Sequence, residues 1–452
     1  MKHLARIPRS RTFSAVVAMA LLCFAASPQA VTTSVSATSA VTLRAEGVSK
    51  PSPVTSSTVV LDTDAVGIAR SVWSAWVEDS ELDPRVDLIE LDFEKGMHEG
   101  AVKITGLSAS PDLLSGFYAA LATRGILFES AVTLLPDAER LKLLTRGVVR
   151  STRAWGAQSR KDLLAGRAAR RVPLGRIVQV LENSFDGVIR VRLDDGWIGW
   201  MREGDLSLVK ESWLIAWNRR DHVLITAPKL RLYTPAGSIV AEVRAGVQLP
   251  LLGKNDKGDW RVALPDGREV IVGAQDAVDW QKFSVSEEND RRADPEAFRA
   301  AIAKTAEALA TAGWSQREDG APIVVTAFRL HDLILDEAVD RAARLSPPRL
   351  AGKQGADLRP GDLVFFGANK TPERVGIWLG GGKFVAEAPG SDKAAVLPFT
   401  GGSNEKANGG MGPFVLAERL PVEVLNNPCL LSTRSNPFHQ APPGPLSRCR
   451  LR

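Results

Sequence analysis

A tandem repeat in the middle of the chain constrains the fold more than any other sequence feature. Residues 187–196 read GVIRVRLDDG and residues 258–267 read GDWRVALPDG, so Gly, Arg, Val, Leu and Gly recur at a constant offset of 71 residues. Each copy alternates apolar and polar residues and ends in an Asp-Gly turn, which is the pattern of short strands joined by tight turns. Two β units in tandem are therefore predicted, over residues 143–210 and 211–284.

The first 30 residues have the composition of an export signal. Basic residues come first, an apolar run follows from Ala15 to Ala26, and small residues continue to Ala30. The apolar run is too short to span a bilayer. We therefore predict a cleaved signal over residues 1–30, no transmembrane anchor, and a mature chain exported to the periplasm or cell envelope.

The charge of the mature chain argues against nucleic acid as a partner. The whole sequence has 57 Lys and Arg against 52 Asp and Glu, and the predicted signal holds four of the basic residues and no acidic ones. The remaining 53 against 52 leave no basic excess to neutralise phosphates. The sequence contains neither a two-histidine metal spacing nor a glycine-rich phosphate loop, so we predict no metal and no cofactor.

The three cysteines are Cys23, Cys429 and Cys449. Cys23 belongs to the predicted signal, whereas export would carry Cys429 and Cys449 into an oxidising compartment. There they can pair with each other or with a partner, and the sequence leaves both alternatives open.

Three further segments are assigned from composition and periodicity. Residues 31–58 are rich in Ser, Thr, Ala, Val and Pro, which predicts a flexible linker. Residues 59–142 predict a small α+β module, with a helix over 111–123 and a strand over 127–134. Pro, Asn and Ser dominate the end of the chain, so we predict a disordered tail over residues 421–452.

A second pair of strand patterns lies nearer the C-terminus. Residues 358–367 read LRPGDLVFFG, where a Pro-Gly-Asp turn leads into an alternating apolar strand. Residues 375–384 read VGIWLGGGKF, in which a second apolar stretch runs into three glycines. The two stretches predict a hairpin-like pair of strands.

These two strands resemble the signature of the NlpC-type cell-wall peptidases, papain-like enzymes that cut the short peptides of bacterial murein. The resemblance implies a papain-like α+β domain over residues 285–420, opened by a helix that Asp294 caps. The repeated β units, especially the first with Trp197 and Trp200, resemble bacterial SH3-like barrels, which attach enzymes of this family to murein. The implied fold class is multidomain α+β, with a small N-terminal module, two SH3-like β-barrels and a papain-like domain.

The residues that carry thiol chemistry in this family are replaced here. Such a peptidase has a cysteine at the N-terminus of a helix, a histidine base, and a third residue that orients the histidine. The register of the resemblance places these three at Gly320, Arg374 and Ala386. Glycine and alanine carry no functional group, and Arg374 stays protonated and cannot accept a proton. Glu387, the next residue along the strand, is expected to point to the opposite face from Ala386.

We therefore predict a catalytically degenerate member that binds murein peptide, or a partner that handles it, without hydrolysis. Asp319, Arg374 and Glu387 would suit a ligand carrying both an amine and a carboxylate. Aromatic side chains can stack on sugars or peptides, which makes three tryptophans candidate ligand contacts, with core packing as the competing interpretation. These are Trp197, Trp200 and Trp378.

Two alternatives come from other functional classes. An active endopeptidase would need a displaced catalytic set, for which Ser315, Thr326 and His331 are the nearby side chains. A purely structural envelope scaffold would neither bind nor cut murein peptide.

Overall fold

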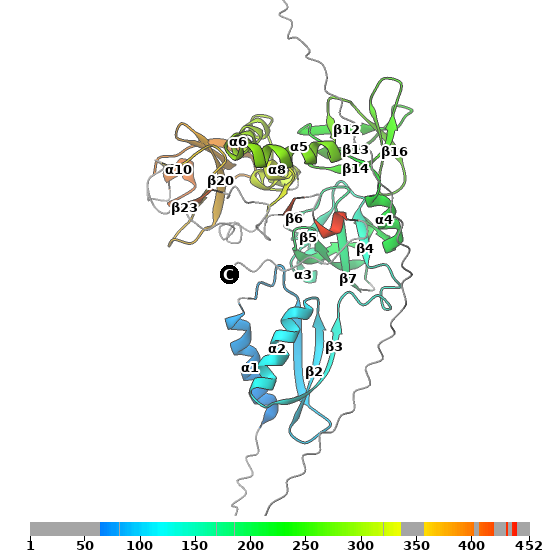
Figure 1. Ribbon diagram of the computed structural model, residues 1–452, viewed down its shortest axis with the longest axis vertical. Helices are drawn as coiled ribbons and strands as arrows, with labels where there is room; N and C mark the ends of the chain where they lie inside the picture. The colour runs from blue at the N-terminus through cyan, green and yellow to red at the C-terminus, as the bar shows by residue number, and fades with distance from the viewer. Residues whose placement is uncertain are drawn as a thin grey trace, which may run out of the picture. The chain divides into compact units, whose positions relative to one another are not determined.

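A computed structural model describes the protein over residues 64–80, 82–168, 170–184, 186–319, 321–335, 357–401, 406–419, 431–432 and 436–440. In these residues the fold is mixed α+β, with several largely antiparallel sheets (Figure 1). The predicted signal and linker lie outside them, as do all three cysteines. Within the described part of the chain, helices long and apolar enough to cross a membrane are absent.

The N-terminal module is a three-stranded sheet packed against two helices. Its elements are α1 (Ala65–Asp79), β1 (Ile89–Lys95), β2 (Ala101–Ser108), α2 (Pro111–Thr123) and β3 (Leu127–Leu134). Strands β1 and β2 are antiparallel, whereas β2 and β3 are parallel because α2 crosses between them. Phe93, Ile104 and Phe117 form the buried centre of the module. The predicted helix over 111–123 and strand over 127–134 are both present.

Two seven-stranded sheets follow. The first has the order β10-β4-β7-β8-β9-β5-β6. Its strands are β4 (Arg146–Val149), β5 (Trp155–Ala157), β6 (Arg170–Arg171), β7 (Ile177–Ser184), β8 (Val188–Leu193), β9 (Ile198–Arg202) and β10 (Leu206–Val209), with helices α3 (Arg160–Leu164) and η1 (Glu203–Asp205) between them. Helix α4 (Glu211–Asn218) leads out of this sheet.

The second sheet has the order β13-β12-β16-β15-β14-β11-β17. Its strands are β11 (His222–Ile225), β12 (Lys229–Tyr233), β13 (Ile239–Arg244), β14 (Gln248–Lys254), β15 (Trp260–Ala263), β16 (Glu269–Val272) and β17 (Ala277–Asp279). The sequence repeat occupies the same place in both sheets, because β8 lies between β7 and β9 and β15 lies between β14 and β16.

Glycine is required at the turns of the repeat. Gly187 and Gly258 have φ angles of 77° and 84°, and Gly196 and Gly267 have φ angles of 91° and 86°. Glycine adopts this left-handed region without steric cost, whereas a side chain would clash with the backbone. The shared glycines therefore fix the same two turns on either side of the shared strand.

The C-terminal domain combines helices with a five-stranded antiparallel sheet of order β22-β21-β20-β19-β23. Its helices are α5 (Trp280–Ala293), α6 (Pro295–Thr311), α7 (Gln316–Asp319), α8 (Ile323–Arg329) and α10 (Ala407–Gly410). Its strands are β18 (Leu333–Ile334), β19 (Leu363–Phe366), β20 (Arg374–Gly380), β21 (Lys383–Glu387), β22 (Ala394–Pro398) and β23 (Phe414–Glu418). The predicted hairpin-like pair corresponds to β19 and β20, which pair directly.

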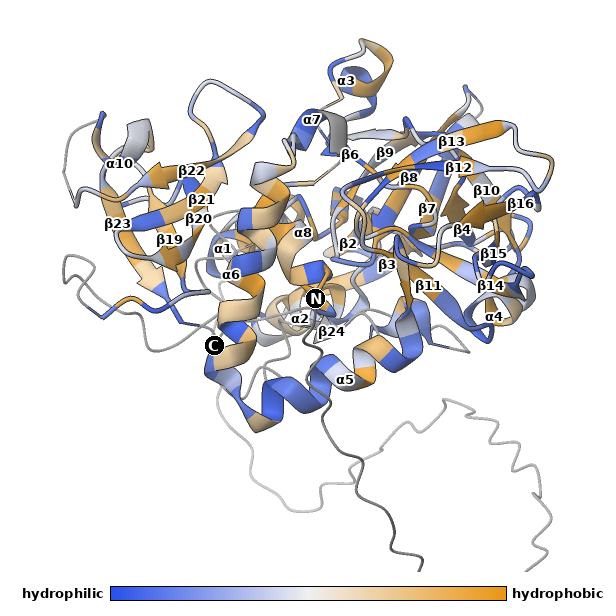
Figure 2. Cartoon of the chain, turned by 90° about the horizontal axis from the view of Figure 1, so that it is seen from above, coloured by the Kyte–Doolittle hydropathy of each residue, from blue (hydrophilic) through white to orange (hydrophobic). Residues whose placement is uncertain are grey.

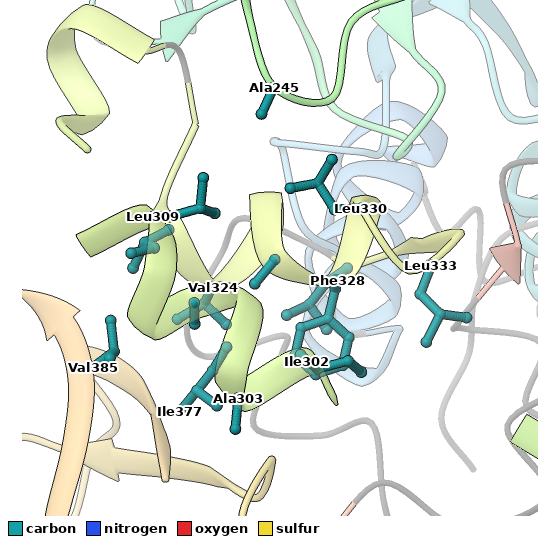
Figure 3. Packing of buried hydrophobic residues seen from close by; sticks show 14 of the residues in the cluster. Ala245, Ile302, Ala303, Leu309, Val324, Phe328, Leu330, Leu333, Ile377 and Val385 are labelled. Carbon is teal, nitrogen blue, oxygen red and sulfur yellow. The ribbon is translucent and has the colours of Figure 1, made fainter. Parts of the chain in front are cut away.

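Local sequence explains how the helices of this domain begin and which faces they bury. The Asp294 side chain accepts a hydrogen bond from Ala297 N, and Pro295 occupies the first turn of α6. Helix α5 is hydrophilic along most of its length (Figure 2). Helices α6 and α8 instead bury apolar side chains, among them Ile302 and Phe328, against the sheet (Figure 3).

The five-stranded sheet is apolar on both faces. Ile377 and Val385 belong to the core shared with α6 and α8 (Figure 3). Phe366, Trp378 and Ala386 belong to a separate core on the other face. Which side a strand residue faces therefore decides whether it can reach the helices.

Two short pieces of the tail, for which the sequence predicts disorder, contact the folded domains. Strand β24 (Leu431–Ser432) pairs with β18, and η3 (Pro437–His439) lies against the first seven-stranded sheet. Phe438 is fully buried beside Leu214 and Trp217. The polar composition of the tail does not predict this contact, because it depends on a single aromatic side chain and on the surface that receives it.

Candidate functional site

The N-terminus of α8 is the place to which the resemblance assigns the nucleophile. Helix α8 begins at Ile323, and the segment before it is held by Trp314, whose Nε1 donates to the Ala321 carbonyl at 3.1 Å. The first backbone N–H groups of a helix have no partner within the helix. Here the Ile323 N–H donates to Oε1 of Glu387 at 2.6 Å. A side chain of the protein itself therefore occupies this end of α8.

Glu387 reaches the helix because of its place on β21. Strand residues alternate between faces, and Ala386 points into the core on the far side of the sheet, where it is fully buried. Glu387 consequently shares the helix-facing side with Val385. The sequence correctly separates the faces of Ala386 and Glu387, but Glu387 is the one that faces the site.

The protonation of Glu387 is shifted by its surroundings. Burial raises the pKa of its carboxyl group, and the hydrogen bond from the Ile323 N–H opposes that rise. The Glu387 carboxyl group thus accepts a hydrogen bond from α8 while it is largely shielded from solvent.

Of the residues that the structure describes, Arg374 contacts Gly410 and not the N-terminus of α8. It is the exposed first residue of β20, and its Nη1 donates to the Gly410 carbonyl at 3.0 Å. Among the described residues, no hydrogen bond or ion pair joins Arg374 to Glu387. Asp319 is the last residue of α7, and Gly320 lies outside the described residues. The structure therefore does not bring Arg374 and Glu387 together in one contact.

The three candidate tryptophans have different surroundings. Trp378 is 5 % exposed and packs edge-on against Phe399 at 5.2 Å between ring centres, so it contributes to the core. Trp197 and Trp200 are partly buried, and each lies under a guanidinium, that of Arg170 at 5.0 Å and that of Arg190 at 5.4 Å. They pack against different apolar clusters.

The side chains considered for a displaced catalytic set lie in two separate places. Ser315 Oγ donates to Asp392 Oδ2 at 2.7 Å, and Thr326 is buried within α8. His331 follows the other end of α8, where Nδ1 lies 2.7 Å from Glu287 Oε2 and Nε2 lies 2.8 Å from Thr305 Oγ1. The order hydroxyl, imidazole, carboxylate is that of a hydrolytic triad. Neither cavity described below is lined by these three residues.

A cavity of about 790 Å³ lies between the first seven-stranded sheet and the C-terminal domain. Gln316 and Arg317 of α7 line it, so it adjoins the segment that leads to the N-terminus of α8. Its charged lining comprises five arginines and two aspartates, namely Arg153, Arg170, Arg171, Arg202, Arg317, Asp205 and Asp392. No local sequence pattern predicts this cavity, because its lining comes from segments up to about 240 residues apart, from Ser151 to Asp392.

A hydrogen bond connects the two walls of the cavity. Arg171 of β6 donates through Nη1 to the Arg317 carbonyl at 3.3 Å and through Nη2 to the Thr152 carbonyl at 2.7 Å. The hydrogen bond from Ser315 lowers the pKa of Asp392, which stays ionised. Burial raises the pKa of Asp205, against the opposing effects of Ser151 and Arg202. The cavity is thus cationic on balance.

A cluster of buried charged residues surrounds Asp194. Asp194 interacts with Arg176, with Arg329 of α8 and with His439 of η3. Burial by itself would raise the pKa of Asp194, but Arg176, Arg329 and His439 outweigh burial and hold the pKa well below its usual range. The cluster ties α8 and the tail to the first sheet.

The C-terminal domain matches a known protein family. Residues 316–407 match the model of the NlpC/P60 family. These residues include α7, α8 and strands β19 to β22, and therefore the Glu387 contact with α8. A search of curated proteins finds no match.

Several solved structures are similar to the chain. One is an NlpC/P60 family protein from Bacillus cereus ATCC 10987, with 16 % identity, 61 % of this chain and 100 % of that chain covered, and a TM-score of 0.47. Another is NlpC1 from Trichomonas vaginalis, with 17 % identity, 61 % and 92 % covered, and a TM-score of 0.29. A third is an NlpC/P60 endopeptidase from Photobacterium damselae subsp. piscicida, with 15 % identity, 62 % and 68 % covered, and a TM-score of 0.38.

Proposed function

We propose that this chain, which carries an NlpC/P60 domain at residues 316–407, is an exported cell-envelope protein that binds murein peptide, or a partner that handles it, without cutting the peptide. Members of this family are typically cell-wall peptidases, which indicates the class of ligand. The positions that the resemblance assigns to thiol chemistry hold Gly320, Arg374 and Ala386. Binding without turnover is the function that these residues favour.

The contact between Glu387 and Ile323 carries the proposal. In a papain-like site the N-terminus of a helix and a nearby imidazolium stabilise the thiolate nucleophile. In this chain the Ile323 N–H is bound to the Glu387 carboxyl group at 2.6 Å. An ionised carboxylate there would disfavour a second anion, so the place suits neither a thiolate nor a tetrahedral oxyanion.

The two seven-stranded sheets supply the proposed means of attachment. We infer that they are SH3-like modules, because they repeat one strand arrangement and the same glycine turns. In the resembling proteins such modules attach the enzyme to murein. The cavity between the first sheet and the C-terminal domain would then receive the peptide.

Retention and turnover, measured on one preparation, test the proposal. The purified mature chain is mixed with murein sacculi and, as a control for non-specific retention, with chitin. We expect the chain to sediment with sacculi and not with chitin, and chromatography of the supernatant to show no released peptide. Peptide release that survives a thiol-blocking reagent would overturn the proposal. Absence of sedimentation with sacculi would favour the structural scaffold, and equal sedimentation with both polymers would overturn specific binding of murein.

One observation favours a second candidate, a hydrolase with a displaced catalytic set. Thr305, His331 and Glu287 form a hydrogen-bonded series in triad order. If peptide release occurs, His331→Gln should abolish it in a variant that still folds, whereas His98→Gln, at a side chain that is 83 % exposed, should leave it unaltered. Our proposal expects no release from any of the three proteins.

A further inference from the structure

The cavity beside α7 has an unusual charge balance for a site of its size. Five arginines and two aspartates line it, a formal excess of three positive charges. A smaller cavity of about 350 Å³ shares Arg153 and Arg171 with it and adds Lys229, Glu242 and Arg244. The combined lining therefore holds seven cationic and three anionic side chains. This excess is local, because the mature chain as a whole is close to neutral.

Some of these cations already have partners. Arg170 pairs with Asp195, Arg171 donates to two backbone carbonyls, and Lys229 pairs with Glu242 at 3.0 Å. These contacts hold the walls of the cavities in place. The positive charge of the larger cavity therefore comes mainly from its remaining arginines.

Three arginines of the larger cavity remain available to a ligand. Arg153, Arg202 and Arg317 are exposed, and among the described residues no hydrogen bond or ion pair engages their guanidinium groups. Arg202 and Arg317 interact with the nearby Asp205 and Asp392 through electrostatics alone. They come from three separate segments, the loop before β5, the end of β9 and helix α7. Each guanidinium presents a planar set of donors that matches a carboxylate or a phosphate.

We propose that this cavity binds a small ligand carrying two or more anionic oxygen groups, with Arg153, Arg202 and Arg317 as its ligands. The proposal rests on the proposed function and names the class of molecule that the binding site selects. A volume of about 790 Å³ is ample for a short peptide. Trp155 adds an aromatic wall against which the apolar part of such a ligand can pack.

The cavity lies close in sequence to the N-terminus of α8. Arg317 lies six residues before Ile323, and its carbonyl is bound by Arg171 of the first sheet. A ligand held by Arg317 would therefore lie between the two parts that this hydrogen bond joins. The Ile323 N–H is already bound to Glu387, so it is not free to bind an anionic ligand. The anionic groups are expected to stay on the arginine side.

Isothermal titration with matched probes tests the inference. The acidic tripeptide N-acetyl-Ala-Glu-Glu is compared with the neutral N-acetyl-Ala-Gln-Gln carboxamide, and pyrophosphate is titrated as a phosphate probe. We expect the acidic peptide to bind at least about tenfold more tightly than its neutral analogue, because a hydrogen bond to a charged group contributes more than one to a neutral group. Added salt should weaken binding of the acidic peptide.

A triple variant identifies the residues. Arg153→Gln, Arg202→Gln and Arg317→Gln together should lower the affinity for the acidic peptide by at least about a hundredfold. Arg124→Gln, an exposed arginine after α2 and away from the cavity, should not alter it. The substituted arginines are all exposed, so the variants are expected to fold. The unfolding midpoint of each variant is recorded, which separates loss of folding from loss of binding.

The possible outcomes separate this inference from the proposed function. Equal affinity for the acidic and neutral peptides, or full affinity in the triple variant, would overturn the anionic ligand class while leaving retention on sacculi intact. Binding of pyrophosphate in preference to the acidic peptide supports the cavity and assigns it to phosphate. Cleavage of a bound peptide, followed by chromatography, would overturn the proposed function while leaving the anion preference in place.

Discussion

The Nη1 atom of Arg329, the last residue of α8, lies 3.4 Å from Oδ2 of Asp194 in the first seven-stranded sheet. The same carboxylate is bound by Arg176 Nε at 2.6 Å and lies 3.2 Å from His439 Nε2. Asp194 has no solvent exposure at its side chain. The position of α8, and with it the proposed site, thus depends on a carboxylate from another part of the chain.

Replacing Asp194 by Ala should be strongly destabilising. The substitution leaves Arg329 buried without its carboxylate and Arg176 with Asp195 alone, and breaking a buried ion pair costs about 3 to 5 kcal/mol in typical cases. Urea unfolding at neutral pH measures the change. Asp92→Ala is the matched control, since Asp92 is an exposed aspartate of β1 and its loss should barely move the midpoint.

The same cluster predicts an acid limit to stability. The folded-state pKa of Asp194 is held below the value of about 3.9 of an unfolded chain. Its contribution is therefore complete above about pH 4 and is lost as the pH falls through the folded pKa. The difference in unfolding free energy between the wild-type chain and Asp194→Ala should shrink below pH 4, and a constant difference down to pH 2 would contradict the assignment.

A cysteine at position 320 should be poorly reactive while Glu387 is present. In a background with Cys429→Ser and Cys449→Ser, Gly320→Cys places a thiol three residues before Ile323, whose N–H is bound to Glu387. An ionised carboxylate raises the pKa of a nearby thiol, so above the raised pKa of Glu387 the change Glu387→Gln should accelerate reaction with a thiol reagent by up to about tenfold. Mass spectrometry of the labelled peptide measures the rate.

Glu307→Gln, at an exposed glutamate of α6, provides the control for the thiol experiment. It should leave the rate of labelling unaltered. Equal rates with Glu387 and with Gln at position 387 would contradict the register that places residue 320 beside this helix end.

Phe438→Ala should release the docked part of the tail. The ring is fully buried with Ile177, Leu214 and Trp217, and truncation of such a phenylalanine typically costs about 3 to 5 kcal/mol. Thermal unfolding and limited proteolysis near residue 438 both report the loss. Ile239→Ala, at a side chain that is 60 % exposed, should alter neither, and a variant Phe438→Ala that behaves like this control would show that the tail does not dock in solution.

His222 should make stability depend on pH above the carboxylate range. Burial lowers its pKa from 6.5 to about 4, and the ring lies between Trp217 and Trp280, with Nδ1 2.8 Å from the Arg220 carbonyl. The unfolded chain binds the proton first, so stability is lost as the pH falls from about 6.5 to about 4, by about 3 kcal/mol in total.

Urea unfolding at several pH values checks the His222 prediction. His222→Gln should remove this part of the pH dependence, whereas His98→Gln, at an exposed side chain, should keep it. A His222 resonance that titrates near pH 6.5 in the folded protein would contradict the predicted direction of the shift.

Much of the fold is readable from the sequence because its signals are local. Alternating residues and an Asp-Gly turn predict the β8 and β15 strands, and Pro111 and Asp294 predict where α2 and α6 begin. The tail is the instructive exception. Its composition predicts disorder, yet Phe438 finds a fully buried place that only the folded sheet and α4 create.

The candidate site divides in the same way. The sequence by itself determined that residues 320, 374 and 386 lack thiol chemistry, because the identity of a side chain limits what it can do wherever it lies. It also determined that Ala386 and Glu387 face opposite sides, because the strand period is two. Only the tertiary structure decided that Glu387 occupies the end of α8, that Arg171 binds the Arg317 carbonyl and that Asp194 holds Arg329. These contacts join residues 64, 146 and 135 positions apart, and no local pattern encodes a meeting of that kind.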